Sequence, residues 1–327
     1  MSLGAQPAAS GALPLGAMVV AAKAVVVGRQ GDIEVVAAAL GAGRSVLLEG
    51  PPGTGKTTLL RALTEGAGIP LVVVEGSAEL TPGRLIGHHD PARIMTEGYA
   101  RDAFVPGPLL EAMTGGGLLY VEELNRVPEE TLNVLLGVLS ERSLHVARYG
   151  AVAAAPTFRL VAAMNPFDAV GTGRISPALY DRTCRVGFGY QSELEEQEIV
   201  ARQSAGPSDL VAAAVRAVRA TRSHPDIRLG ASVRGALDLV SLAGGLASLR
   251  AVDLAAGWRE LGGDAAPAAL SVRVAPRDAA GRPVEEVIAE IWRKAAGEGD
   301  QAGKAIGPGA PSPRAARDRS HAASRQS

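Results

Sequence analysis

The chain lacks features that would indicate export or insertion into a membrane. It has one cysteine, Cys184, among 327 residues, so an intramolecular disulfide cannot form and a reducing compartment is expected. The apolar stretch near its start is interrupted by Pro14, Gly16 and Lys23, and it falls short of the roughly 20 residues of a spanning helix. No basic segment precedes it, as one would in a secretory signal. We therefore expect a cytoplasmic protein without a membrane span.

The chain also has no large excess of either charge, and it has few aromatic residues. The 33 basic and 34 acidic residues leave a net charge of −1, whereas dedicated nucleic-acid-binding proteins usually have a basic excess. This balance argues weakly against that class and leaves a local basic pore open. Aromatic residues make up 3% of a chain that is 47% hydrophobic, and small aliphatic side chains suit helices packed tightly on a sheet. The length allows one large domain and one smaller domain.

The strongest motif is GPPGTGKT at residues 50–57, which fits the phosphate-binding P-loop pattern in full. It lies between an apolar run and a predicted helix, 57–64, as this motif requires. The glycines let main-chain N–H groups surround phosphates, Lys56 brings a positive charge, and the Thr57 hydroxyl can bind Mg²⁺. The alternative is a glycine-rich turn that matches by chance. The residues expected to bind ATP are Gly50, Pro51, Pro52, Gly53, Thr54, Gly55, Lys56, Thr57 and Thr58.

A second motif is the apolar run 118–121, which ends in Glu122 and Glu123. In P-loop ATPases, acids at the end of such a strand hold Mg²⁺ and activate the attacking water. Glu123 is the candidate catalytic base, because a carboxylate there can orient this water. Glu122 is the candidate metal residue together with Thr57, but it is one methylene longer than the usual Asp, which could relax the metal geometry and slow hydrolysis. The alternative is two ordinary exposed acids.

Alternating apolar runs and helical segments predict an α/β domain over residues 25–190. A strand-like run from Val25 leads into a predicted helix, 32–40, with Asp32 as its N-cap. Strands that alternate with helices, such as 128–141, imply a parallel five-stranded sheet between helices. The predicted strands of this sheet are 45–49, 71–75, 118–121, 158–164 and 184–188.

The pattern becomes helical after residue 190. Three segments predict helices without an apolar strand between them, 192–203, 209–221 and 232–249. We interpret 191–250 as a small all-helical lid domain. The rest is an extension, 251–295, with a helix over 283–294 and a β-like piece over 270–274.

Both ends of the chain are rich in Ala, Gly, Ser and Pro. This composition predicts disorder for residues 1–24 and 296–327, because such segments bury too little apolar surface to offset the entropy of ordering.

In order along the chain, these motifs resemble those of the MoxR-type AAA+ ATPases, which sit with the magnesium-chelatase and dynein-related branches. EELNR at 122–126, followed by VPEETLNVLLGVLSER, is similar to the second signature of this family, and the resemblance runs from about residue 27 to 247. It implies a P-loop AAA+ core followed by the helical lid. It also implies β-hairpins at 87–108 and 144–157, which would face the ring pore or the partner; mobile surface loops are the alternative.

The resemblance also implies roles for polar residues outside the two motifs. Asn165, in FRLVAAMNPF, falls on the sensor 1 position that contacts the γ-phosphate or the attacking water. Arg182, in SPALYDR, falls on the arginine finger that reaches a neighbouring subunit's ATP site. Arg234, in GASVR, falls on sensor 2 and would touch the γ-phosphate from the lid. Arg174 is a weaker second candidate for a contact between subunits. Each arginine alone could be an ordinary surface charge.

As a whole, the resemblance implies a homo-oligomeric ring, commonly a hexamer, with ATP and Mg²⁺ bound between subunits. It implies a chaperone that hydrolyses ATP and remodels or activates a protein client, often beside a von Willebrand factor A domain protein. Glu122 prompts the alternative of a nucleotide-binding scaffold with little hydrolysis. A nucleic-acid-associated AAA+ motor is the other alternative, and the charge balance makes nucleic acid the less expected partner.

Overall fold

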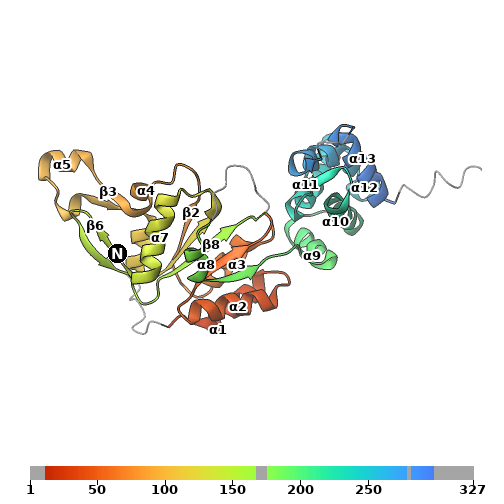
Figure 1. Ribbon diagram of the computed structural model, residues 1–327. Helices are drawn as coiled ribbons and strands as arrows, with labels where there is room; N and C mark the ends of the chain where they lie inside the picture. Colours follow the sequence, from red (N-terminus) through yellow and green to blue (C-terminus); the bar gives the residue numbers. More distant parts are fainter. Residues whose placement is uncertain (1–11, 167–174, 278–280, 298–327) are drawn as a thin grey trace, which may run out of the picture.

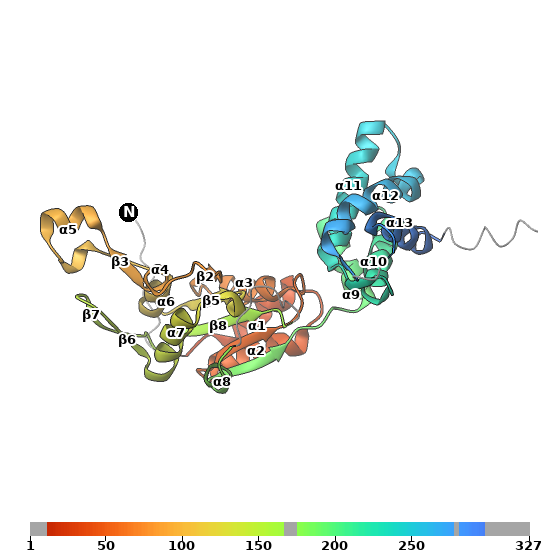
Figure 2. The ribbon, with the colours of Figure 1, turned by 45° about the horizontal axis from the view of Figure 1, so that its top comes forward.

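The computed structural model describes residues 12–166, 175–277 and 281–297, which form two lobes (Figure 1). The larger lobe has a parallel sheet in the order β2-β5-β8-β1-β9. The bounds of its strands are β1 Ser45–Glu49, β2 Leu71–Glu75, β5 Leu118–Glu122, β8 Arg159–Met164 and β9 Thr183–Gly187. The smaller, helical lobe lies at one end of the larger lobe in both ribbon views (Figure 2). These features confirm the predicted α/β P-loop AAA+ fold with its five-stranded sheet.

Both faces of the sheet are buried. Val46 and Leu48 of β1 pack on one face, and Leu47, between them, packs on the other. The first face is covered by α1 Leu15–Val25, α2 Gln30–Gly41 and α3 Lys56–Glu65. The second is covered by α4 Pro82–Ile86, α6 Pro108–Gly115, α7 Glu129–Glu141 and α8 Pro177–Asp181. Polar groups of the sheet are therefore available to a ligand mainly at the strand ends.

The segment before the sheet is ordered from residue 12, so the predicted disorder is wrong for residues 12–24. Met18 and Ala22 of α1 are fully buried, because the helix packs against α2 and α3. Residues 1–11 lie outside the described part of the chain.

The strand predicted from Val25 is also wrong. Val25 is the last residue of α1, and a short loop leads from it to α2. The N-cap of α2 is Arg29, in the left-handed conformation with φ 57°, and Asp32 lies within the first turn. The run of β-branched residues is consistent with a strand locally, but tertiary packing places it at a helix end and in a loop.

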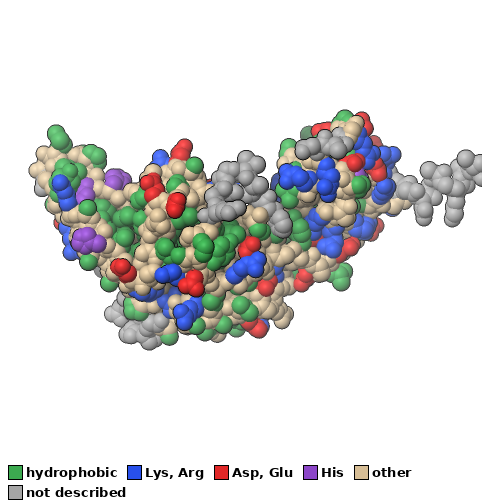
Figure 3. Space-filling model, in the orientation of Figure 1, with side chains coloured by type: hydrophobic (Ala, Val, Ile, Leu, Met, Phe, Trp, Pro, Cys, Tyr) green, Lys and Arg blue, Asp and Glu red, His purple; other side chains and the backbone are tan. Residues whose placement is uncertain are grey.

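Two hairpins extend from the larger lobe at the end opposite the helical lobe (Figure 1). In the first, β3 Gly87–His89 pairs antiparallel with β4 Phe104–Pro106, and α5 Pro91–Glu97 lies between them. In the second, β6 Ser143–Val146 pairs with β7 Gly150–Ala153. The rings of Phe104 and Tyr149 join the two hairpins, with centroids 4.6 Å apart. Hairpins are thus present at both predicted places, and Figure 3 shows histidine side chains at this end.

The helical lobe has one continuous core, so the boundary predicted after residue 250 does not separate two cores. Its helices are α9 Glu193–Gln203, α10 Ser208–Ser223, α11 Val233–Arg250, α12 Leu254–Leu270 and α13 Val284–Ala295. The sequence did not predict α12, and the β-like piece over 270–274 is wrong, since it is the end of α12 followed by the 3-10 turn Ser271–Arg273. The lobe also contains a small ribbon in which β10 Ile227–Leu229 pairs with β11 Ala275–Pro276.

Glycine residues weaken the helical pattern of α12 in the sequence, and the tertiary structure requires the one at position 262. A Cβ at Gly262 would lie 2.2 Å from Cζ2 of Trp292 on α13. Glycine therefore lets α13 approach α12, although glycine disfavours helix in isolation.

Within the described ranges, no single helix has the length and apolar content to cross a membrane. The bent pair Val233–Arg250 and Leu254–Arg273, with a 114° bend, meets both criteria only when its members are taken together.

The packing of α1 predicts a clear difference between two substitutions on this helix. We expect Met18→Ala to lower the free energy of unfolding by about 2–4 kcal/mol, because it leaves a cavity at a fully buried side chain. Val20 on the same helix is 71% exposed, and Val20→Ala should change it by less than about 0.5 kcal/mol. Urea denaturation followed by circular dichroism measures both, and equal effects would contradict the packing described for α1.

Candidate nucleotide-binding site

The predicted phosphate loop lies between β1 and α3, at the carboxyl end of the sheet. Gly53 and Gly55 have positive φ angles of 72° and 87°, which glycine adopts without strain. The Thr54 hydroxyl donates to the Pro51 carbonyl oxygen at 2.9 Å, and this bond closes the turn. The loop therefore precedes the N-terminus of α3, where unpaired N–H groups and the helix dipole favour an anion.

Lys56 is held inside this loop. Its Nζ donates to the carbonyl oxygens of Gly50 at 2.8 Å and Pro51 at 2.9 Å. Burial lowers the pKa of Lys56, and the nearby Glu123 carboxylate opposes this effect. The side chain is thus a preplaced cation whose partners are carbonyl oxygens, which a phosphate could replace.

The two acids at the end of β5 lie beside the loop. The Thr57 hydroxyl donates to Glu122 Oε1, and the Tyr120 hydroxyl lies 3.4 Å from Thr57 Oγ1. Burial raises the pKa of Tyr120, so this hydroxyl stays protonated at neutral pH. The structure therefore brings together the two residues predicted to hold Mg²⁺ and adds a tyrosine that we did not predict.

Glu123 has an unusual backbone and an available oxygen. Its φ is 48°, in the left-handed region that non-glycine residues seldom adopt. Its Oε2 is buried and has no hydrogen-bond partner among the described residues, although Arg126 Nε lies 3.7 Å away. An observed outlier of this kind is a reason to suspect a functional role.

These side chains line one pocket with the phosphate loop. The residues that line it are Pro52, Gly53, Thr54, Gly55, Lys56, Thr57, Thr58, Tyr120, Glu122, Glu123, Ala163, Met164 and Arg234. Arg234 reaches it from the helical lobe, at the start of α11. The segment before it packs tightly on the loop, since a Cβ at Gly53 would lie 2.4 Å from Ser232 Oγ. Both lobes therefore contribute to the pocket.

The other predicted residues do not line this pocket. Asn165 directly follows β8 and is 9% exposed; its carbonyl oxygen accepts from Asn125 Nδ2 at 3.5 Å. Arg182 follows α8, and its Nε donates to Ser140 Oγ at 2.8 Å. Arg174 lies outside the described residues. The structure thus joins the P-loop, the two acids and Arg234, whereas it leaves Arg182 away from the site of its own chain.

A second, more apolar cavity of about 310 Å³ adjoins the first. The loop residues Gly53, Gly55 and Thr58 and the lid residue Arg234 line both cavities. Its apolar walls are Val25, Val26, Val27, Ile199, Val233 and Leu237. The run of valines that the sequence presented as a strand is therefore one wall of a cavity between the lobes.

Arg29 also lines the second cavity, and sequence reasoning missed it. Its side chain is 7% exposed and forms an ion pair with Asp32 at 3.0 Å. It donates to the Gly189 carbonyl oxygen and lies over the Phe188 ring, 4.7 Å from the centroid. A single buried arginine has no periodic signal in sequence, whereas Tyr120 could have been found, because alternation puts it on the same face of β5 as Glu122.

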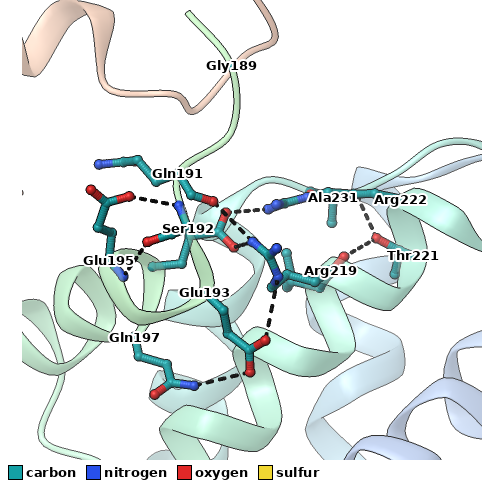
Figure 4. Close-up of polar contacts among 12 residues, drawn as sticks. Gly189, Gln191, Ser192, Glu193, Glu195, Gln197, Arg219, Thr221, Arg222 and Ala231 are labelled. Carbon is teal, nitrogen blue, oxygen red and sulfur yellow. Dashed lines mark hydrogen bonds and ion pairs between the residues drawn. The ribbon is translucent and has the colours of Figure 1, made fainter. Parts of the chain in front are cut away.

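The linker between β9 and α9, residues 188–192, is bonded to the helical lobe by an ion-pair network around a buried glutamate (Figure 4). Glu196 of α9 is 2% exposed and accepts from Arg219 NH1 at 3.0 Å and Arg222 NH2 at 2.6 Å. Arg219 also donates to the Gln191 carbonyl oxygen of the linker at 3.0 Å. Arg222 donates through Nε to the Ala231 carbonyl oxygen at 2.9 Å. This network ties the linker to the turn that presents Ser232 and Arg234.

Comparison with known proteins gives one family. Residues 45–183, from β1 to the start of β9, match the model of the AAA domain of the dynein-related subfamily. This match and the fold support the predicted AAA+ type, and they do not distinguish the MoxR type within it.

Individual relatives add little about activity. An uncharacterized protein of Staphylococcus epidermidis is 32% identical over 171 residues, which are 48% of this chain and 64% of that protein. One of Staphylococcus aureus is 36% identical over 149 residues, 45% of this chain and 56% of that protein. The chain thus spans less than two thirds of the length of these relatives.

Two solved structures resemble the fold at low identity. A candidate ATPase from Cytophaga hutchinsonii has a TM-score of 0.46 and 21% identity, over 85% of this chain and 92% of that chain. A RuvB variant from Thermotoga maritima has a TM-score of 0.46 and 18% identity, over 71% of this chain and 65% of that chain. Neither likeness bears on the function.

The ion-pair network predicts a stability difference between two glutamates of α9. We expect Glu196→Gln to lower the free energy of unfolding of the helical lobe by about 2–3 kcal/mol, because two arginines lose their buried counter-charge. Glu198 on the same helix pairs with Arg202 at 2.5 Å, and both are about half exposed; Glu198→Gln should cost less than about 0.5 kcal/mol. Urea denaturation followed by tryptophan fluorescence tests this, since Trp258 and Trp292 both lie in the helical core. Similar losses for the two variants would argue against the network.

Proposed function

We propose that this chain is a MoxR-like AAA+ ATPase, which binds and hydrolyses ATP with Mg²⁺ and uses the cycle to remodel or activate a protein partner. The observation that favours this most is one pocket that contains the P-loop with Lys56, the Thr57–Glu122 pair, Glu123 and the lid residue Arg234. These groups come from three separate segments of the chain, the P-loop, the end of β5 and the start of α11, and a chance P-loop match would not bring them together.

The groups present fit ATP and Mg²⁺. The phosphate region offers the ammonium of Lys56 and the N-terminus of α3, both of which attract anions. Thr57 and Glu122 are in contact and supply hard oxygen donors, which Mg²⁺ prefers. The apolar second cavity suits a purine base and shares Gly53 and Gly55 with the phosphate region. When bound, Mg²⁺ would neutralise part of the phosphate charge.

The chain's own residues then have distinct tasks. Lys56 exchanges its carbonyl partners for phosphate oxygens. Glu123 Oε2 accepts a hydrogen bond from the attacking water and orients it, because this oxygen is buried and lacks a hydrogen-bond partner among the described residues. Asn165, next to Asn125, holds the same water or the γ-phosphate, and Arg234 contacts the γ-phosphate from the lid. The lid thereby senses whether the nucleotide is a triphosphate.

Arg182 completes the site of a neighbouring subunit in a homo-oligomeric ring, commonly a hexamer in proteins of this type. In its own subunit it bonds Ser140 and the Ala178 carbonyl oxygen and does not line the pocket. An arginine contributed in trans can stabilise the charge that develops in phosphoryl transfer.

We place the client at the paired hairpins β3–β4 and β6–β7, which lie at the end opposite the lid (Figure 1). A von Willebrand factor A domain protein as partner, and a cytoplasmic location, remain part of the same proposal. On the face shown in Figure 3, acidic and basic side chains are interspersed, which suits a protein partner better than nucleic acid.

ATP turnover is the direct test of the catalytic assignment. We expect Mg²⁺-dependent hydrolysis by the wild type, and a loss of at least about 100-fold for Lys56→Ala and Glu123→Gln. Glu123→Gln should still bind ATP, because the phosphate contacts remain. The matched controls Lys23→Ala and Glu130→Gln, at exposed positions, should keep full activity. ATP binding without turnover at any protein concentration would favour the regulatory scaffold, and stimulation by DNA would favour the nucleic-acid motor.

Mixing two inactive variants tests the role of Arg182 between subunits. Arg182→Ala lacks the proposed finger, and Glu123→Gln lacks the base. A mixed interface can combine Glu123 of one subunit with Arg182 of the next, so mixing should restore part of the activity. If Arg182 acts within its own subunit, no site in the mixture is complete and activity stays absent. Wild-type specific activity should also rise with protein concentration.

A further inference from the structure

Tyr120 is a core residue whose polar tip lies in the proposed catalytic pocket. The residue is 1% exposed, and its ring packs among the side chains beneath α3. Its hydroxyl lies 3.4 Å from Thr57 Oγ1. Thr57 in turn donates to Glu122 Oε1. Thr57 thus links the Tyr120 hydroxyl to the Glu122 carboxylate at the end of β5.

Core packing alone does not require the hydroxyl of Tyr120. Phe would fill the same space beneath α3, whereas a buried hydroxyl must find partners or destabilise the fold. The partner of the Tyr120 hydroxyl is Thr57, which in turn donates to Glu122, and these are the two side chains that we propose for the metal.

The contact bears on how firmly the Glu122 carboxylate is held. A glutamate has one more rotatable bond than the aspartate usual at this position, so fixing its carboxylate costs more conformational entropy. The hydrogen bond from Thr57 reduces the freedom that remains, and the Tyr120 hydroxyl, whose ring is fixed by core packing, helps to hold Thr57 in place. Outer hydrogen bonds of this kind commonly orient metal ligands.

We propose that Tyr120 is a positioning residue, which holds Thr57 and the longer Glu122 carboxylate in the arrangement that binds the divalent cation of the metal–nucleotide complex. This inference rests on the proposed function. Tyr120 contacts neither nucleotide nor metal in this account; it acts through Thr57 and Glu122.

The test is Tyr120→Phe, which removes only the hydroxyl. Mn²⁺ affinity is measured by electron paramagnetic resonance on the complex with a non-hydrolysable ATP analogue, and Mg²⁺ affinity by competition. We expect both affinities to fall by about tenfold. Affinity for the analogue in EDTA should change by less than about twofold, because the phosphate contacts do not involve Tyr120. Tyr149→Phe, on the β6–β7 hairpin, is the matched control and should leave both metal affinities unchanged.

A double-mutant cycle with Glu122→Asp separates positioning from packing. The shorter carboxylate withdraws from the Thr57 hydroxyl that Tyr120 contacts, so in the Glu122→Asp background Tyr120→Phe should weaken metal binding by less than about twofold. An equal loss in both backgrounds would overturn the role of the longer carboxylate. A loss of analogue affinity in EDTA as large as the loss of metal affinity would show a packing role and overturn the inference.

The wild type distinguishes failure of this inference from failure of the function. If the wild type binds the metal–nucleotide complex and Tyr120→Phe binds it equally well, the inference is wrong and the proposed function stands. If the wild type binds neither nucleotide nor the complex, the proposed function is wrong and the inference falls with it.

Discussion

The loop between β1 and α3 must direct several main-chain N–H groups toward one point, and the rest of the site is built around this requirement. Such a turn needs positive φ angles, which Gly53 and Gly55 supply. It also needs a rigid base, which the buried strand β1 provides, paired with β8 on one side and β9 on the other. Because the strands are parallel, their carboxyl ends meet at one edge, and this places Glu122 of β5 beside Thr57 of α3.

The helical lobe is coupled to this loop by close packing and by charge. Ser232 packs against Gly53, and its neighbour Ala231 is bonded to Arg222, which shares the buried Glu196 with Arg219. The same network reaches the linker at Gln191, whose side chain donates to the Val27 carbonyl oxygen at 2.7 Å. A nucleotide between the lobes would therefore contact segments that are bonded to the helical lobe.

Glu122 stands where an aspartate is usual, and Tyr120 brings a hydroxyl into a hydrophobic core cluster. Two residues apart on one strand, they share a face and meet at Thr57. The longer acid and the added hydroxyl are thus parts of one arrangement, and its effect on a metal at the proposed site would depend on geometry as well as on charge.

Local patterns in the sequence were sufficient for the sheet, the phosphate loop, the two acids and most helices, because each depends on periodicity or on a short motif. They failed where a residue serves a distant partner. The valines at positions 25–27 predict a strand locally, but they form a cavity wall. Gly262 disfavours a helix locally, but it makes room for Trp292. By itself the sequence determined a P-loop α/β protein with acids at a strand end. Only the tertiary structure decided that Tyr120, Arg29 and the lid converge on that loop, since their positions depend on packing between segments far apart in the chain.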